Sequence, residues 1–379
     1  MSGFRTLTGA EPIRVVIAGA GAMGRQWMQN ATRNSDVRLV GVADVVEAAA
    51  ERAVAELQLE ECASAGDAVA LARRVGADAV INVTIPAAHH PVTTAALAAG
   101  FAVIGEKPAA ATVSEALSLA AAAELSNQLF VVSQSRRYDE NIFALKYLAG
   151  TLGAVGIVNV GFFRDPRFGG FREEMDHPLL LDMAIHPFDS VRFLLGTDPV
   201  SVVAEEFNPV WSAFAGDAAA AVNFTMSDGS RFLYNASWAS AGLQTSWNGE
   251  WRLSGENGTA LWDGDHAPVA GDGETQRIAS PVPPGESIAG SLADFVTALR
   301  TGVAPMGEIH ENIMSLAMVE AAVTAARTGE RVLIDDALAA WHGEAIAAET
   351  DPAVAEILRS WASVRDALTA RVGAQAAAG

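Results

Sequence analysis

Short runs of β-branched and other apolar residues alternate with alanine-rich segments through the first third of the chain. The alanine-rich segments repeat apolar residues three or four positions apart, as in Val113, Leu117 and Ala120, which is helical spacing. Strands that alternate with helices build a parallel sheet with helices on both faces. We therefore expect strands at 15–17, 37–42, 79–83, 101–104 and 129–132.

The pattern changes after about residue 135, so we expect a first domain over 1–135 and a second over 136–379. Between 200 and 262, alternating strand-like runs are separated by turn signals such as Ser227-Asp228-Gly229, which predicts an antiparallel sheet. A long, irregular loop is expected at 263–285 because it is rich in glycine and proline. Helices are expected at 179–195, 287–300, 308–328, 335–347 and 353–372.

Composition and charge exclude several classes of function. The chain carries 25 Lys+Arg against 45 Asp+Glu, a formal net charge of −20 at pH 7, and this field repels nucleic acids and anionic membrane surfaces. The uncharged stretch at 79–105 contains Asn82 and Pro86, so it predicts a buried core segment instead of a membrane span. Because Cys62 is the single cysteine and the first residues lack a secretory pattern, we expect a cytoplasmic protein.

A glycine pattern directly after the first expected strand predicts a dinucleotide site. Gly19, Gly21 and Gly24 form G-x-G-x-x-G at the start of an expected helix, whose N-terminus attracts a pyrophosphate. Asp44 follows Gly24 by 20 positions, where a carboxylate binds the ribose diol and repels a 2′-phosphate. NAD is therefore the expected cofactor, with NADP as the alternative because Arg25 and Arg52 lie close in sequence.

Two further motifs carry ionisable groups. Glu106-Lys107-Pro108 follows the fourth expected strand, which puts a lysine at the carboxyl edge of the sheet, where such folds bind ligands. Asp182, His186 and Asp189 are spaced i, i+4 and i+7, so a regular helix would place them on one stripe beside apolar neighbours. We interpret the stripe as a cleft wall, with a structural histidine–aspartate pair as the alternative. No metal is expected there, because a third ligand is missing at any characteristic spacing.

These motifs, in this order, resemble the Gfo/Idh/MocA oxidoreductases. Gly19–Gly24 is similar to that family's G-x-G-x-M-G turn, Glu106–Pro108 to its E-K-P signature, and Asp182–Asp189 to its D-x-G-x-H-x-x-D helix. The resemblance implies an α/β protein with an N-terminal Rossmann doubly wound sheet and a C-terminal domain with a large, open, mainly antiparallel sheet. It also implies hydride transfer between NAD(P) and a secondary alcohol or ketone of a sugar, polyol or sugar derivative.

The resemblance assigns roles to residues of this chain. Lys107 and His186 would act on the reacting oxygen and its proton, and Asp182 would orient them. The chain departs from the family pattern at Ala184, which replaces a glycine, and at Pro187, which predicts a kink at His186. The expected cofactor contacts are Gly19, Gly21, Ala22, Met23, Gly24, Asp44, Thr84, His90, Glu106 and Lys107; Ala87 stands where the segment before His90 commonly has asparagine.

A polar loop before the 179–195 helix supplies further substrate candidates. Arg164, Arg172 and His177 stand out in a strongly acidic chain, and together with Asp189 they are expected to bind hydroxyls or a carboxylate. The alternative is a solvated loop with ordinary surface charges. Two other functions would use the same fold: an NAD-dependent glycosidase that oxidises its sugar transiently, and a non-catalytic sensor.

Tryptophans concentrate in the strand-rich segment. Five of the eight lie there, and aromatic rows on an open sheet commonly pack against another layer or subunit. We therefore expect a homodimer or homotetramer formed through the C-terminal sheet, with stacking on a sugar as the alternative. The five residues are Trp211, Trp238, Trp247, Trp251 and Trp262.

Overall fold

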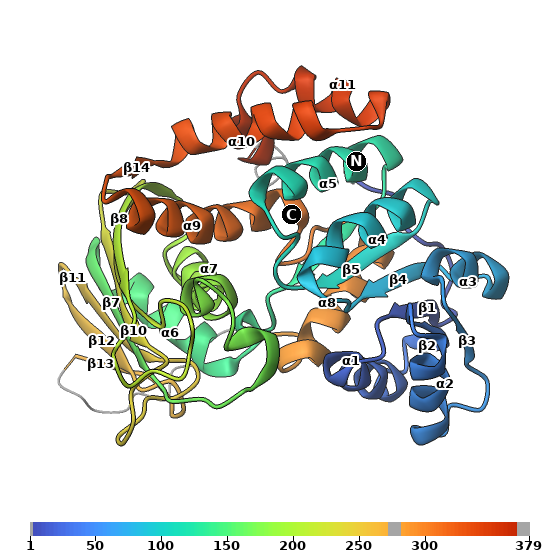
Figure 1. The fold of residues 1–379 in the computed structure, drawn as a ribbon, viewed down its shortest axis with the longest axis horizontal. Helices are drawn as coiled ribbons and strands as arrows, with labels where there is room; N and C mark the ends of the chain where they lie inside the picture. Colours follow the sequence, from blue (N-terminus) through green and yellow to red (C-terminus); the bar gives the residue numbers. More distant parts are fainter. Residues whose placement is uncertain (1–2, 272–281, 370–379) are drawn as a thin grey trace. The chain divides into compact units, whose positions relative to one another are not determined.

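The computed structural model describes residues 3–271 and 282–369, and the chain forms two compact units (Figure 1). The chain first passes from one unit to the other after Ser135, where the sequence pattern changes. The first unit comprises residues 1–135, 284–313 and 339–379, and the second comprises residues 136–283 and 314–338. Two late segments, 284–313 and 339–379, thus group with the first unit, whereas the sequence pattern assigns them to the second domain.

Long-range packing explains this grouping. Helix α8 (Ser287–Thr301) buries Phe295 and Leu299 in the same hydrophobic core as Ile17 and Trp27 from the beginning of the chain. Helix α11 (Pro352–Ser360) packs against α5 (Val113–Ser126). Contacts between residues so far apart leave no local pattern in the sequence.

The first unit contains a six-stranded sheet in the order β3-β2-β1-β4-β5-β6, and every neighbouring pair is parallel. This is the strand order of the doubly wound dinucleotide-binding fold, which confirms the expected Rossmann sheet. The three-residue strand β3 was not predicted, because Ala-Ser-Ala carries no strand pattern. The strands are β1 (Ile13–Ala18), β2 (Val37–Ala43), β3 (Ala63–Ala65), β4 (Ala79–Asn82), β5 (Ala102–Glu106) and β6 (Phe130–Ser133).

The helices of this sheet differ in how they begin. In α3 (Ala68–Val75) the Asp67 side chain accepts a hydrogen bond from the helix N-terminus, and Thr112 does the same for α5. Helix α1 (Ala22–Arg33) begins after Gly21 with no side-chain cap, so its first amides are available to a ligand. The other two helices are α2 (Glu47–Glu56) and α4 (Pro86–Ala98).

The second unit contains an eight-stranded sheet in the order β13-β12-β11-β7-β10-β9-β8-β14. All its pairs are antiparallel except β7 with β10, which confirms the expected mainly antiparallel sheet. The strands are β7 (Val155–Phe163), β8 (Pro199–Phe207), β9 (Ala219–Met226), β10 (Arg231–Ser237), β11 (Glu250–Gly255), β12 (Gly258–Trp262), β13 (Val269–Ala270) and β14 (Val332–Leu333).

The expected helix at 179–195 has two parts. Leu179–Ala184 forms π-helical turns, and α7 (Ile185–Leu195) continues as a regular α-helix. The change of helix type falls immediately before His186 and Pro187, close to the kink that the proline predicts. The ring of Phe188 in α7 packs edge-on against rings on the sheet, those of Phe224, Phe232 and Tyr234.

Strand alternation gives the second sheet one buried and one exposed face. Trp238, Trp251 and Trp262 point to the buried face and are at most 4% exposed. The interface expected from the tryptophans therefore does not involve these three side chains, because they pack within their own unit. Trp211 is 69% exposed and Trp247 is 39% exposed, so only these two of the five keep substantial exposure.

Three helices complete the described chain: α6 (Glu140–Thr151), α9 (Ile309–Thr328) and α10 (Ile334–Ala348). The expected helix at 353–372 stops at Ser360, resumes at 364–369, and its last three residues lie outside the described residues. The expected loop at 263–285 contains the short strand β13, and its residues 272–281 also lie outside them. Among the helices that the structure describes, none has the length and apolar character needed to span a membrane.

Candidate functional site

The turn between β1 and α1 accepts only glycine at two positions. Gly19 has a φ of +108°, and a Cβ there would lie 2.5 Å from the carbonyl oxygen of Val83. A Cβ on Gly24 would lie 2.1 Å from the carbonyl oxygen of Gly19. Ala22 and Met23 form the exposed first turn of α1. The turn thus presents uncapped amides, and its glycines place no side chain beside them, which is what a pyrophosphate requires.

Asp44 is held at the carboxyl end of β2 by the neighbouring backbone. One carboxylate oxygen accepts a hydrogen bond from the amide of Ala20 at 2.9 Å, and the other accepts one from Val46 at 2.9 Å. A carboxylate has about four lone-pair sites, so both oxygens can still accept ribose hydroxyls. Arg25, which favoured NADP, forms an ion pair with Glu56 at 2.9 Å. The carboxylates of Asp44 and Glu56 therefore both disfavour the binding of a 2′-phosphate in this region.

The segment after β4 is shaped by Asn82 and His89. The Asn82 amide donates to the carbonyl of His89 at 3.1 Å, and its oxygen accepts from the Thr84 hydroxyl at 2.7 Å. The His89 ring lies 2.6 Å from the carbonyl oxygen of Pro108 and 3.1 Å from that of Thr84, and burial lowers the pKa of this histidine. His89 therefore links the two segments that follow β4 and β5.

His90, the histidine selected by family spacing, faces another part of the first unit. Its Nε2 atom lies 3.3 Å from the hydroxyl of Ser118 on α5. Adjacent helical residues point about 100° apart, so His89 and His90 cannot face the same neighbours. Sequence reasoning chose between two adjacent histidines by spacing, and it missed the buried contacts of His89 because these depend on the loop after β5.

Glu106 and Lys107 end β5 at the same edge of the sheet. The indole Nε1 of Trp27 donates to Glu106 at 2.8 Å, and the Lys107 amide donates to it at 3.2 Å. Burial raises the pKa of Glu106, while these contacts oppose the rise. Because the strands are parallel, their carboxyl ends bring the glycine turn, Asp44, Thr84 and Lys107 to one edge.

In the second unit, Asp182 forms an ion pair with the loop that precedes it. Arg172 Nε donates to its carboxylate at 2.6 Å, with side-chain exposures of 39% for the arginine and 21% for the aspartate. The Arg172 guanidinium also lies 4.9 Å from the ring centre of Phe171. The loop is thereby fastened to the π-helical turns that carry Asp182.

His186 lines a small cavity together with Arg136, Asn248 and Trp251. Arg136 donates to the carbonyl of Trp247; burial lowers the pKa of its guanidinium to about 10, and the charge of Asp182 opposes this change. Arg136 therefore acts electrostatically on the predicted aspartate, yet sequence reasoning missed it. No pattern marks it, since it lies directly after the domain boundary and far from both motifs in sequence.

The remaining substrate candidates all have partners within the second unit. Asp189 is 2% exposed, and Arg137 holds its two oxygens at 2.6 Å each. Arg164 donates to the carbonyl of Thr245 at 2.6 Å, and His177 lies 2.8 Å from Glu206. The expected stripe is thus divided: Asp182 and His186 remain partly exposed, whereas Asp189 is buried in its ion pair with Arg137.

Comparison with known proteins agrees with both halves of this arrangement. Residues 13–134 match the GFO_IDH_MocA model, described as an oxidoreductase family with an NAD-binding Rossmann fold. Residues 147–261 match the GFO/IDH/MocA C-terminal domain. An oxidoreductase from Agrobacterium radiobacter, solved in complex with NAD+, L-tartaric acid and magnesium, has the same fold: the TM-score is 0.76 at 21% identity, covering 86% of this chain and 99% of that one.

Two curated relatives align over most of their length. An uncharacterized protein of Sinorhizobium fredii is 28% identical over 355 residues, covering 87% of this chain and 98% of its own. An inositol 2-dehydrogenase of Rhizobium meliloti is 28% identical over 342 residues, covering 82% of this chain and 96% of its own. The two family matches, the strand order and the glycine turn agree, and the chain belongs to the Gfo/Idh/MocA family of NAD-binding oxidoreductases.

Proposed function

We propose that this protein is a dehydrogenase that transfers a hydride between NAD and a secondary alcohol of a polyol or sugar. The observation that carries the proposal is the single sheet edge that brings together the glycine turn, Asp44 and Lys107. The similarity to an inositol 2-dehydrogenase supports a polyol as the substrate. In this proposal the cofactor binds to residues 1–135 of the first unit, and the substrate binds to the second unit, residues 136–283 and 314–338.

The residues at this edge fit NAD. The space that a Cβ would fill at Gly19 and Gly24 is taken by backbone oxygens, and the amides of α1 are uncapped, so the turn can accept a pyrophosphate. Asp44 would accept the ribose hydroxyls, and Thr84 and Glu106 complete the proposed cofactor contacts. His90 is not among them, because it faces Ser118 on α5. When bound there, NAD supplies the hydride acceptor.

The chemical step assigns different tasks to two residues. His186 accepts the hydroxyl proton as the C–H bond breaks, because an imidazole titrates near neutral pH. Lys107 donates a hydrogen bond to the same oxygen and stabilises the negative charge that develops on it. Asp182 orients these groups, and its pair with Arg172 holds the preceding loop in place.

Two further candidates act as positioning residues. Asp189 fixes α7, and with it His186, through Arg137 and the hydroxyl of Ser315 at 2.7 Å. His89 fixes the loop that follows Lys107 through the carbonyl of Pro108. Arg164 is retained as a substrate-side candidate, and its contact with the carbonyl of Thr245 fastens the 164–177 loop. His177 is assigned no substrate contact, because it faces Glu206.

The test is incubation of the purified protein with NAD and a panel of polyols, sugars and glycosides, with reduced cofactor followed by absorbance. We expect net NAD reduction with at least one polyol or sugar. Cleavage of a glycoside without net reduction would instead indicate a glycosidase, and neither reaction would indicate a sensor. A Lys107→Met/His186→Ala double variant should lose less than the product of the single losses, because both residues serve one oxygen.

We also propose a cytoplasmic homodimer or homotetramer that associates through the exposed face of the second sheet. Register places Leu261, Arg252, Asn159, Leu233 and Asn223 in one row across that face. The two leucines provide apolar contact area in a row that is otherwise polar, and an interface between subunits buries apolar positions at its core. Light scattering should give a multiple of 39.4 kDa, and Leu233→Glu should lower it, whereas a monomer at every concentration would refute the proposal.

A further inference from the structure

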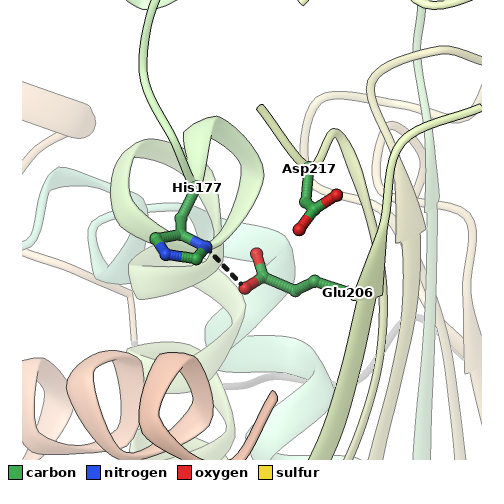
Figure 2. A group of neighbouring side chains, drawn as sticks. All are labelled: His177, Glu206 and Asp217. Carbon is green, nitrogen blue, oxygen red and sulfur yellow. Dashed lines mark hydrogen bonds and ion pairs between the residues drawn. The ribbon is translucent and has the colours of Figure 1, made fainter. Parts of the chain in front are cut away.

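Three side chains that the proposed reaction does not use lie together in the second unit (Figure 2). His177 precedes the π-helical turns, Glu206 lies near the end of β8, and Asp217 lies two residues before β9. One potential ligand atom from each, an imidazole nitrogen and two carboxylate oxygens, lies within 4.8 Å of the other two. His177 Nδ1 is 2.8 Å from a carboxylate oxygen of Glu206.

The backbone brings these three distant segments together. The amide of Asp217 donates to the carbonyl of Asp176 at 2.9 Å, and that of Ala215 donates to Glu173 at 2.8 Å. A Cβ on Gly216 would lie 2.1 Å from the carbonyl oxygen of Asp176, so only glycine permits this approach. These backbone hydrogen bonds and the close approach at Gly216 therefore fix the position of Asp217 beside His177.

A second observation concerns Glu206 alone. Its side chain is only 2% exposed, and its Oε1 atom accepts no hydrogen bond from any residue in the described ranges 3–271 and 282–369. Figure 2 shows this oxygen turned toward the carboxylate of Asp217. A buried carboxylate oxygen beside a second carboxylate lacks the positive partner that would stabilise it.

We propose that His177, Glu206 and Asp217 bind one divalent transition-metal ion of the zinc type. An imidazole nitrogen favours such ions over magnesium or calcium, and three protein ligands leave a position for water. Tetrahedral zinc ligands lie about 3.4 Å apart, a value between the 2.8 Å of the His177–Glu206 pair and the 4.8 Å that bounds the cluster. The ion would fasten the loop that carries Arg172 to β8, and thereby hold the ion pair of that arginine with Asp182.

Zinc binding to the untagged, EDTA-treated full chain tests the site. Titration with ZnCl2 against a chromophoric chelator should give one equivalent per chain. His177→Gln, Glu206→Gln and Asp217→Asn should each weaken binding at least tenfold. His266→Gln is the matched control, because His266 forms an exposed pair with Asp263 at 2.7 Å and should leave the affinity unchanged. Absence of stoichiometric binding, or wild-type affinity in all three site variants, would overturn the proposal.

X-ray absorption at the zinc edge tests the wild-type protein without any variant. We expect one imidazole nitrogen around the zinc, with oxygen atoms as all the other ligands. A ligand set with two or more imidazoles, or one that contains sulfur, would place the ion elsewhere and refute the site. Neither measurement depends on dehydrogenase activity, so failure here leaves the proposed reaction untouched, and the reverse also holds.

Discussion

Replacement of Gly24 by alanine should damage the dinucleotide turn by an amount that the structure allows us to work out. The new Cβ would lie 2.1 Å from the carbonyl oxygen of Gly19, and a separation of at least 3.0 Å requires the helix and the turn to move apart by about 1 Å. Such overpacking costs about 1–3 kcal/mol of folding stability. An amide hydrogen bond that is stretched by about 1 Å from 2.9 Å is lost. Loss of two charge-assisted bonds from the turn to the pyrophosphate, at about 1.5 kcal/mol each, should raise the Kd for NAD ~100-fold.

Gly21→Ala separates binding from folding at the same turn. Gly21 has a φ of −69°, and a Cβ at this position would have no atom of the described residues within 4 Å beyond its chain neighbours, so alanine there should leave the Tm unchanged. The added methyl nevertheless lies where a pyrophosphate would approach, so the Kd for NAD should rise by about tenfold. Calorimetric titration with NAD and thermal unfolding measure both effects. Wild-type Tm and Kd in Gly24→Ala would refute the described packing, and a wild-type Kd in Gly21→Ala would refute the pyrophosphate position.

The remaining predictions concern the catalytic groups and the two cores. Lys107→Met and His186→Ala should each lower turnover by about 10²–10⁴-fold. Calorimetry should find the Kd for NAD within about threefold of wild type, since the glycine turn and Asp44 provide the main contacts to the cofactor. Asp189→Ala should lower the free energy of unfolding by about 3–5 kcal/mol in urea, because its buried arginine partner is left uncompensated; a loss below about 1 kcal/mol would contradict the buried pair. Burial lowers the pKa of His89 below 6.5, so its contribution to stability is present above pH 6.5 and is lost as the pH falls below that value. In urea unfolding, the free energy of unfolding of His89→Gln should therefore depend less on pH than that of the wild type. An unchanged pH dependence would show that His89 is not the group responsible. Gly343→Ala, in the interior of α10 with no described atom near the added Cβ, should stabilise the chain by about 0.5–1 kcal/mol, and a lower Tm would contradict the helix.

Local patterns in the sequence predicted the elements whose chemistry is local. The five expected strands of the first sheet form with their boundaries shifted by at most two residues, because short apolar runs bounded by turn residues leave few alternatives. The glycine turn was equally predictable from its spacing. Gly24 is required by a contact within the motif, with Gly19, whereas Gly19 is required by the approach of Val83 after β4. The doubly wound Rossmann arrangement of this sheet was expected from the family resemblance.

Features that depend on distant contacts could not be predicted in the same way. The grouping of α8 and α11 with the first unit rests on packing between the two ends of the sequence. The interior position of Asp189 depends on its buried partner Arg137, which no spacing in the sequence marks. The roles of Arg136 and of the His177 cluster have the same origin, because their partners come from separate strands and loops.

The central claim is direct hydride transfer from a carbinol carbon to NAD, and isotope labelling tests it most directly. The substrate selected by the panel, or myo-inositol deuterated at carbon 2 as the first probe, is oxidised by the wild-type protein, and the reduced cofactor is examined by mass spectrometry and NMR. The account predicts one deuterium on the nicotinamide ring for each turnover, and a turnover in Lys107→Met and His186→Ala reduced by about 10²–10⁴-fold. Deuterium released to water, or unlabelled reduced cofactor, would contradict it.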